Sequence, residues 1–254
     1  MHVERFESAL WETSSLLLAN DGEAVLVDPG ISTGEVARLA ARAEELGVRV
    51  AAVLVTHADW DHICGLAAFP EAEAAMGEAS AARVEASAPW KRIDEAAAFY
   101  GFEVPGARLA DRRLEVGRAH RVGPFTVETM PLPGHTHDGV GYRIRELDLL
   151  VLGDHLSSIE FPFVSSPAAY RATLAGLIDL LRRDPPARVV VGHGPEHTAA
   201  EALAIAEADL DYLWRLHDAV LRGADPPEPP RPCADDLAEM LGSNADAQRA
   251  ELGL

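Results

Sequence analysis

Short apolar runs separated by turn residues open the chain. Residues 14–19 and 24–27 are mainly apolar and flank an Asn-Asp-Gly sequence, which is typical of a β-hairpin. Residues 34–46 carry apolar side chains at the spacing of one helix face, and residues 50–55 form an aliphatic run that predicts a buried strand. This strand–helix–strand order predicts an α/β domain whose helices cover a sheet.

The same alternation of elements continues through the rest of the sequence. A helix is predicted from residue 61 or 62 to residue 69, and the Ala- and Glu-rich residues 71–110 predict helices and loops over one edge of the sheet. Further strands are predicted at 116–122, 125–130, 140–144, 147–152 and 188–191. Further helices are predicted at 167–183, at 199–221 and near 235–241, the last after a Pro-rich acidic linker at 224–232.

The composition of the 254 residues narrows the class of protein. A hydrophobic content of 48% allows a large core without disulfides or a folding partner. With 22 basic against 41 acidic residues, the net charge of -19 opposes a phosphate backbone, so we expect no nucleic-acid partner. The apolar runs are too short to span a membrane, and the first ten residues lack the basic and apolar regions of a signal peptide.

The cysteine content favours a reducing compartment. Cys64 and Cys233 are too few for a disulfide framework, and neither lies in a C-x-x-C pair. Cys64 falls inside a predicted helix, where a cysteine usually acts as a small buried apolar residue. We therefore expect a cytoplasmic protein.

Polar side chains that can bind metals follow four of the predicted strands, at the point where each strand ends. They are His57, Asp59, Asp61 and His62 at the first strand end, His135 at the second, Asp154 at the third and His193 at the fourth. Because the carboxyl ends of strands share one edge of an open α/β sheet, we expect these side chains to meet. Alternate residues of an extended segment point the same way, so His57 and Asp59 can bind one ion while Asp61 and His62 face a second.

Each of these residues alone would have an ordinary explanation. An isolated histidine in a loop is usually exposed, and an isolated aspartate before a helix is usually a cap. Burying seven such groups together without a metal would be costly, so the set as a whole predicts a metal site. Three neighbouring histidines are expected to orient a ligand, to contact substrate or to lie on the surface: His137, His155 and His197.

In order and spacing, these motifs resemble the metallo-β-lactamase superfamily from about residue 14 to residue 200. The family's first signature is H-x-H-x-D-H, followed by a histidine after Pro-Gly, an aspartate, and a histidine in a Gly-His-Gly turn. This chain has H-x-D-x-D-H at 57–62, Pro-Gly-His at 133–135, Gly-Asp at 153–154 and Gly-His-Gly at 192–194. The sequence V-L-V-D-P-G at 25–30 is also similar to a strand of the family that ends in Asp.

The resemblance implies an α/β fold, a four-layer αββα sandwich, with two divalent metal ions in a cleft at its edge. We expect the catalytic domain to cover residues 1–223, with residues 224–254 packed against it. By residue-wise correspondence, metal 1 would be held by His57, Asp59 and His135, metal 2 by Asp61, His62 and His193, and Asp154 would bridge them. A hydroxide between the metals, oriented by Asp61, would attack a small ester, thioester, lactone, amide or phosphoester.

Asp59 departs from the family pattern, which has a histidine at this position. Three carboxylates against two divalent ions leave about one surplus positive charge instead of about two, so the bound water should be less acidic. Zinc is the expected metal, and the added carboxylate shifts the preference toward manganese or iron. Flavodiiron proteins carry a carboxylate at the same place, so a diiron oxidoreductase is an alternative, although the chain after residue 200 is too short for a flavodoxin-like domain.

A non-catalytic binding protein on the same fold is a third hypothesis, which ranks last because the ligand set is complete. We expect a small-molecule substrate, and make no prediction of the oligomeric state. Residues 71–110 and the loop 157–167, which contains Phe161 and Phe163, are expected to shape the pocket.

Overall fold

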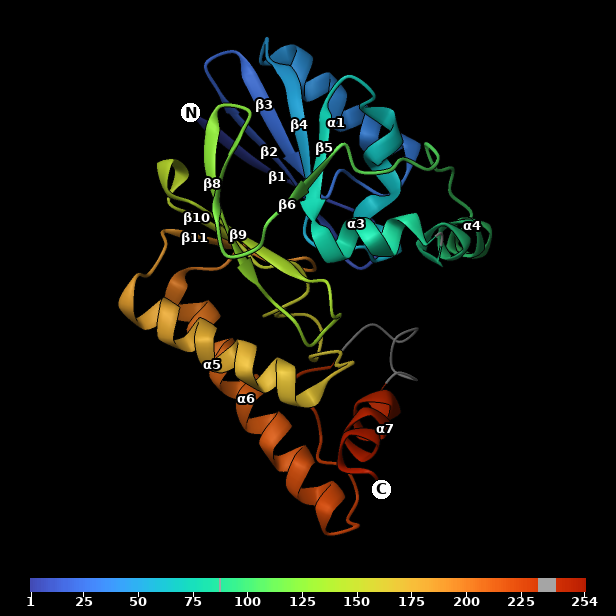
Figure 1. Cartoon of the computed structure of the whole chain (residues 1–254), viewed down its shortest axis with the longest axis vertical. Helices are drawn as coiled ribbons and strands as arrows, with labels where there is room; N and C mark the ends of the chain where they lie inside the picture. The colour runs from blue at the N-terminus through green and yellow to red at the C-terminus, as the bar shows by residue number, and fades with distance from the viewer. Residues whose placement is uncertain (87, 233–240) are drawn as a thin grey trace.

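Two sheets face each other between layers of helices in the computed structural model, which describes residues 1–86, 88–232 and 241–254 (Figure 1). The first sheet follows chain order and contains β1 (His2–Glu7), β2 (Ser14–Asn20), β3 (Glu23–Val27), β4 (Arg49–Val55), β5 (Glu73–Gly77) and β6 (Arg112–Leu114). The second has the order β11 (Arg188–Val190), β10 (Leu149–Val151), β9 (Val140–Ile144), β8 (Phe125–Pro131) and β7 (Ala119–Val122). This arrangement confirms the predicted αββα sandwich.

The helices divide between the two outer faces. Near the first sheet lie α1 (Thr33–Glu45), α2 (Trp60–Ile63), a 3₁₀ turn at Cys64–Ala68, α3 (Glu78–Glu85) and α4 (Ala88–Tyr100). In the chain, α5 (Pro167–Arg183) follows β10 and α6 (Ala199–Leu221) follows the edge strand β11; the two helices pack against each other and against α7 (Leu241–Leu252) (Figure 1). A further 3₁₀ turn, Arg145–Leu147, joins β9 to β10.

The alternation of side chains along β2 explains the layers. Leu16 and Leu18 belong to the apolar cluster between the two sheets, whereas Leu17 points the other way and packs in the cluster that includes Leu39 of α1. A third cluster fills the space beneath α5 and α6. Because successive strand residues face opposite sides, one aliphatic run can serve two cores.

The direction of the strands brings polar loops to one end of the sandwich. In the first sheet β3, β4, β5 and β6 are parallel, and in the second β10 and β11 are parallel. Their carboxyl ends therefore lie at a common edge, where the loops after β4, β8, β10 and β11 carry the predicted metal-binding residues.

Two predictions from the sequence differ from the structure. Residues 71–110 contain strand β5 as well as helices, and β6 follows them; Ala74 and Ala75 of β5 are fully buried. Alanine favours helix locally, but pairing with β4 places this segment in the sheet.

The predicted helix at 61–69 is a single α turn followed by 3₁₀ structure. Gly65 there lies so close to the backbone of Pro29 that a Cβ would be 1.9 Å from its carbonyl oxygen. The helix predicted near 235–241 falls outside the described residues except for its last position, where α7 begins.

Candidate metal centre

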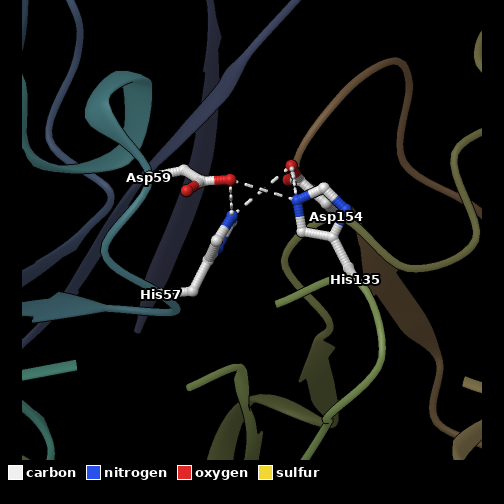
Figure 2. Close-up of side chains that lie close together, drawn as sticks. All are labelled: His57, Asp59, His135 and Asp154. Carbon is white, nitrogen blue, oxygen red and sulfur yellow. Dashed lines mark hydrogen bonds and ion pairs between the residues drawn. The ribbon is translucent and has the colours of Figure 1, made fainter. Parts of the chain in front are cut away.

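The seven predicted ligands converge at the edge of the sandwich on four loops. Figure 2 shows four of them, His57, Asp59, His135 and Asp154, pointing toward a common centre. We call this set the first cluster. The other three form the second cluster: Asp61, His62 and His193.

The donor atoms of the first cluster have the separations expected around one small metal ion. Oδ2 of Asp59 and Oδ2 of Asp154 each lie 3.2 Å from Nε2 of His135 and 3.5 Å from Nε2 of His57. Four ligands about 2.0 to 2.2 Å from a tetrahedral zinc ion are separated by about 3.3 to 3.6 Å. The geometry of the first cluster therefore fits a metal ion at its centre.

Asp154 also faces the second cluster. Its Oδ1 lies 3.0 Å from Nε2 of His62, and its Oδ2 lies 3.3 Å from Nε2 of His193. Oδ2 of Asp61 is 3.4 Å from both of those nitrogens. One carboxylate thus lies between two groups of potential ligands.

The second ring nitrogen of each histidine is already engaged. Nδ1 of His62 donates to Oδ2 of Asp28 at 2.9 Å, and Nδ1 of His57 lies 3.1 Å from the hydroxyl of Thr56. The Nδ1 atoms of His135 and His193 donate to the carbonyl oxygens of Phe163 and Trp11. These bonds fix each neutral imidazole so that its Nε2 lone pair faces the clusters.

Several of these buried atoms lack a hydrogen-bond partner. They are Nε2 of His57, Nε2 of His62 and Oδ1 of Asp154. Buried polar atoms are almost always paired, so three such atoms at the two neighbouring clusters indicate sites for cations. The residues present fit divalent metal ions.

The electrostatics of the centre agree with this interpretation. Burial disfavours a charged Asp154, but the surrounding histidines, His193 first, outweigh burial and hold the pKa of its carboxyl well below the ordinary value. Burial also opposes protonation of His193, but the carboxylate of Asp154 outweighs it and raises the pKa of the imidazole to about 9. The centre therefore binds positive charge strongly, either as protons or as metal ions.

Comparison with known families agrees with the geometry. The sequence profile of the metallo-beta-lactamase superfamily matches residues 9–193. The chain belongs to this superfamily. Its match includes both clusters in full.

Relatives in the superfamily point to hydrolysis. The chain is 28% identical over 190 residues to the probable metallo-hydrolase YqgX of Bacillus subtilis (strain 168), covering 73% of this chain and 86% of YqgX. It is 27% identical over 198 residues to the hydroxyacylglutathione hydrolase GloC of Haemophilus influenzae, a match that covers 76% of this chain and 91% of GloC. The crystal structure of TTHA1623 in a di-iron-bound form matches with a TM-score of 0.60 at 28% identity. The match covers 78% of this chain and 96% of TTHA1623. Metal-dependent hydrolysis is therefore the supported general activity.

The three neighbouring histidines lie apart from the hydrogen bonds of the centre. His155 is buried and stacks on Tyr170 with ring centroids 4.6 Å apart, and burial lowers the pKa of its imidazole to about 3. His137 is exposed, and His197 is buried beside Val189 of β11. Within the described residues, none of the three is hydrogen-bonded to a predicted ligand.

Four residues near the centre had no role assigned from the sequence. They are Asp28, Arg83, Asp138 and Glu160. Asp28 follows the strand within the V-L-V-D-P-G sequence, a signal that could have identified it as a partner of a metal-binding histidine. Asp138 lies three residues after His135 on the same loop, whereas Arg83 and Glu160 reach the centre through the packing of other segments.

An open cleft lies over both clusters. Its walls combine the rings of Trp11, Trp60 and Phe163 with two charged side chains, Arg92 and Glu160. Phe163 confirms that the loop 157–167 shapes the cleft, whereas Phe161 is buried behind it with ring centroids 4.2 Å apart. The cleft can therefore hold an organic molecule that has an apolar part next to the metal centre.

The carboxyl group of Glu160 is nearly buried and has no hydrogen-bond or ion-pair partner in the described part of the chain. Burial raises the pKa of this carboxyl to about 7. A polar group in this state needs a partner from the ligand or from water.

In the described part of the chain, no helix combines the length and apolarity needed to cross a membrane.

Proposed function

We propose that this chain is a dinuclear metallo-hydrolase that cleaves small acyl esters or thioesters with zinc as its working metal. The observation that carries the proposal is the position of Asp154, whose carboxylate lies 3.0 to 3.3 Å from histidine nitrogens of both clusters. A carboxylate shared by two ligand groups is the arrangement that holds two metal ions a few ångströms apart.

Each cluster would hold one ion. His57, Asp59 and His135 would bind metal 1, Asp61, His62 and His193 would bind metal 2, and Asp154 would bridge them. Two divalent metals supply a Lewis acid for the acyl oxygen and lower the pKa of a bound water molecule toward neutrality. Asp61 would accept a hydrogen bond from that water and orient it toward the acyl carbon, because its Oδ2 faces the second cluster.

The walls of the cleft support an acyl substrate. Trp11, Trp60 and Phe163 offer apolar surface for the acyl group and keep bulk water from it. The exposed guanidinium of Arg92 has no ion-pair partner in the described part of the chain, so it can bind a carboxylate on the other half of the substrate. The relative GloC is named a hydroxyacylglutathione hydrolase, which favours thioesters of acidic thiols over lactones and phosphoesters.

A diiron oxidoreductase is the second candidate function. The carboxylate of Asp59 favours harder ions than a histidine does, and the related TTHA1623 has been crystallised in a di-iron-bound form. Iron would then serve redox chemistry in the same cleft. We also propose a cytoplasmic location, because Cys64 is a free thiol in the core.

Metal analysis together with a substrate panel tests the proposal. Protein purified without added metal is expected to hold two zinc ions per chain and to hydrolyse acyl-glutathione thioesters faster than lactones or phosphodiesters of similar size. Asp154→Ala is expected to lower the metal content and abolish turnover, whereas Asp21→Asn, in an exposed turn, should change neither. Two iron ions with oxygen consumption and no turnover of the panel would replace the hydrolase with the oxidoreductase.

A further inference from the structure

Arg83 of α3 lies beside the one position at which this chain departs from the usual ligand pattern of its superfamily. Its Nη2 donates to Oδ1 of Asp59, and its Nη1 donates to Oδ1 of Asp138 at 2.9 Å. Oδ2 of Asp138 in turn accepts the backbone N–H of Ala58 at 2.8 Å. The guanidinium therefore connects α3 to the metal-binding loop on both sides of Ala58.

The two oxygens of Asp59 have separate partners. Oδ1 is bound by Arg83, and Oδ2 faces the first cluster, 3.2 Å from Nε2 of His135 and 3.5 Å from Nε2 of His57. A free carboxylate can bind a metal through both oxygens, but a carboxylate held by a guanidinium on one side offers a single donor atom. In this respect Asp59 behaves like the Nε2 atom of a histidine.

Arg83 also changes the charge of the centre. Asp59, Asp61 and Asp154 remove three of the four positive charges that two divalent ions would bring, and the guanidinium restores one. The side chain of Arg83 is 21% exposed, so solvent screens this charge only in part. Counted over the ligands and this guanidinium alone, the total equals that of a centre with a histidine at position 59 and no arginine; Asp138, which also pairs with Arg83, lies outside the ligand set.

We propose that Arg83 is a positioning residue for metal 1 and that the Asp59–Arg83 pair replaces the usual histidine, with one donor atom and no net charge. This inference rests on the proposed function, because it requires a metal in the first cluster. It predicts that the site keeps a preference for zinc despite its extra carboxylate. Without the guanidinium, Asp59 would bind through both oxygens and favour ions that accept more oxygen ligands, such as manganese.

The alternative is that the ion pairs of Arg83 only stabilise the packing of α3 against the metal-binding loop that contains Asp59. Such a role would affect the stability of the fold without changing which metal binds. The chain offers a matched control for this role, since Arg113 of β6 pairs with Glu85, two residues after Arg83 in the last turn of α3, and lies outside both clusters. Arg113→Gln removes one ion pair from the same helix and leaves the metal centre intact.

Metal competition on the full chain tests the inference. Wild type, Arg83→Gln, Arg83→Lys and Arg113→Gln are stripped of metal, equilibrated with mixed zinc and manganese buffers, and analysed for bound metal by mass spectrometry. Arg83→Gln is expected to lower the zinc-over-manganese preference of one of the two metal equivalents by about tenfold, the size typical of lost partners around a metal ligand. Arg83→Lys, which keeps the charge, should retain most of the preference, and Arg113→Gln should retain all of it.

A double-variant comparison separates charge from structure. In Asp59→His the guanidinium keeps Asp138 but loses the ligand carboxylate that it neutralises, so its Nη2 side lies against a neutral ligand and occupancy of the first cluster should fall. Adding Arg83→Gln should then raise zinc occupancy of the first cluster, whereas in the wild-type background the same substitution weakens zinc binding relative to manganese. Loss of occupancy in both backgrounds, or an unchanged zinc preference in Arg83→Gln, would overturn the inference.

The outcomes also separate this inference from the proposed function. If the wild-type chain binds fewer than two metal ions, the dinuclear hydrolase fails, and the inference fails with it when the first cluster is the one that binds no ion. If the wild type binds two ions and turns over thioesters while Arg83→Gln keeps the zinc preference, only the role of Arg83 is wrong. Unfolding temperatures of the metal-free proteins, measured in parallel, report whether each variant is folded.

Discussion

Nδ1 of His62 lies 2.9 Å from Oδ2 of Asp28, and both side chains are buried. Asp28 also accepts the backbone N–H and the hydroxyl of Thr56, so its carboxylate is held from two sides. A carboxylate in this position orients a metal-binding imidazole and increases its basicity. Asp28 therefore affects the second cluster indirectly, by orienting the imidazole of His62.

Replacing Asp28 with asparagine should weaken metal binding. Asparagine has the same shape and tolerates the positive φ of 48° at this position, so the fold should be kept. We expect Asp28→Asn to lower the affinity of one metal equivalent by about 10- to 100-fold, measured by competition with a chelator. Asp21→Asn is a matched control, because Asp21 has a φ of 51° in an exposed turn. Equal affinities in the two variants would contradict the role given to Asp28.

Gly192 provides the space that Asp154 occupies. A Cβ at this position would lie 2.0 Å from Oδ1 of Asp154 and 3.1 Å from Cε1 of His62. Gly192→Ala should therefore displace the bridging carboxylate and reduce bound metal, measured by elemental analysis, to one equivalent or less. Gly176→Ala is the control, because a Cβ there meets nothing within 4 Å and alanine stabilises a helix by up to about 1 kcal/mol. Full metal content in Gly192→Ala would show that Asp154 does not need its present position.

The protonation of His193 makes metal binding depend on pH. Burial alone would lower the pKa of this imidazole, but Asp154 and Glu160 raise it from 6.5 to about 9. In the metal-free protein, the stabilising proton is fully bound below pH 6.5, and its contribution is lost as the pH rises through about 9.

Metal binding requires the neutral imidazole, so affinity should rise over the same range while the unfolding temperature of the metal-free protein falls. Chelator competition and thermal unfolding between pH 6.5 and 9 measure both trends. Affinity that stays constant with pH would contradict this account. The Asp28→Asn variant should show the same pH trend at lower affinity, because it keeps His193 and Asp154.

Asn244 of α7 holds the loop that forms one wall of the cleft. Its Oδ1 accepts the N–H of Val164 at 3.0 Å, and its Nδ2 donates to the carbonyl oxygen of Pro162 at 2.7 Å. Asn244→Ala leaves both buried backbone groups unpaired, at a cost on the order of 2 kcal/mol.

Because Phe163 lies between the two anchored residues, we expect Asn244→Ala to raise KM severalfold with little change in bound metal. Steady-state kinetics and metal analysis test this expectation. Asp246→Ala, an exposed position on the same helix, is the control. A fall in bound metal with an unchanged KM would mean that α7 acts on the metal centre instead.

Most of the sandwich could be predicted because its signals are local. The aliphatic alternation in β2 and the apolar face of α5 depend on neighbours in the sequence, and the ligands follow strand ends that parallel strands bring together. β5 was not predicted, because Ala74 and Ala75 favour helix until β4 pairs with them. Local propensity and tertiary pairing disagree in that segment, and pairing decides the structure.

The parts of the site that were not predicted depend on packing between distant segments. Arg83 is 24 residues from Asp59 in a stretch that showed no ligand pattern, and its contact with Asp59 depends on where α3 packs. Glu160 likewise lies in an apolar loop, and its position over the centre depends on bonds from Arg231 and Ser157 to its backbone. Charge compensation of this kind leaves no motif in a single sequence.

The bond between Asn244 and the cleft loop joins parts of the chain that are made at different times. All residues of both clusters precede α7 in the sequence, so they leave the ribosome before Asn244 does. A nascent chain can therefore take up its metal ions before the wall that contains Phe163 is fixed. The chain order thus allows metal loading to precede completion of the substrate cleft during biosynthesis.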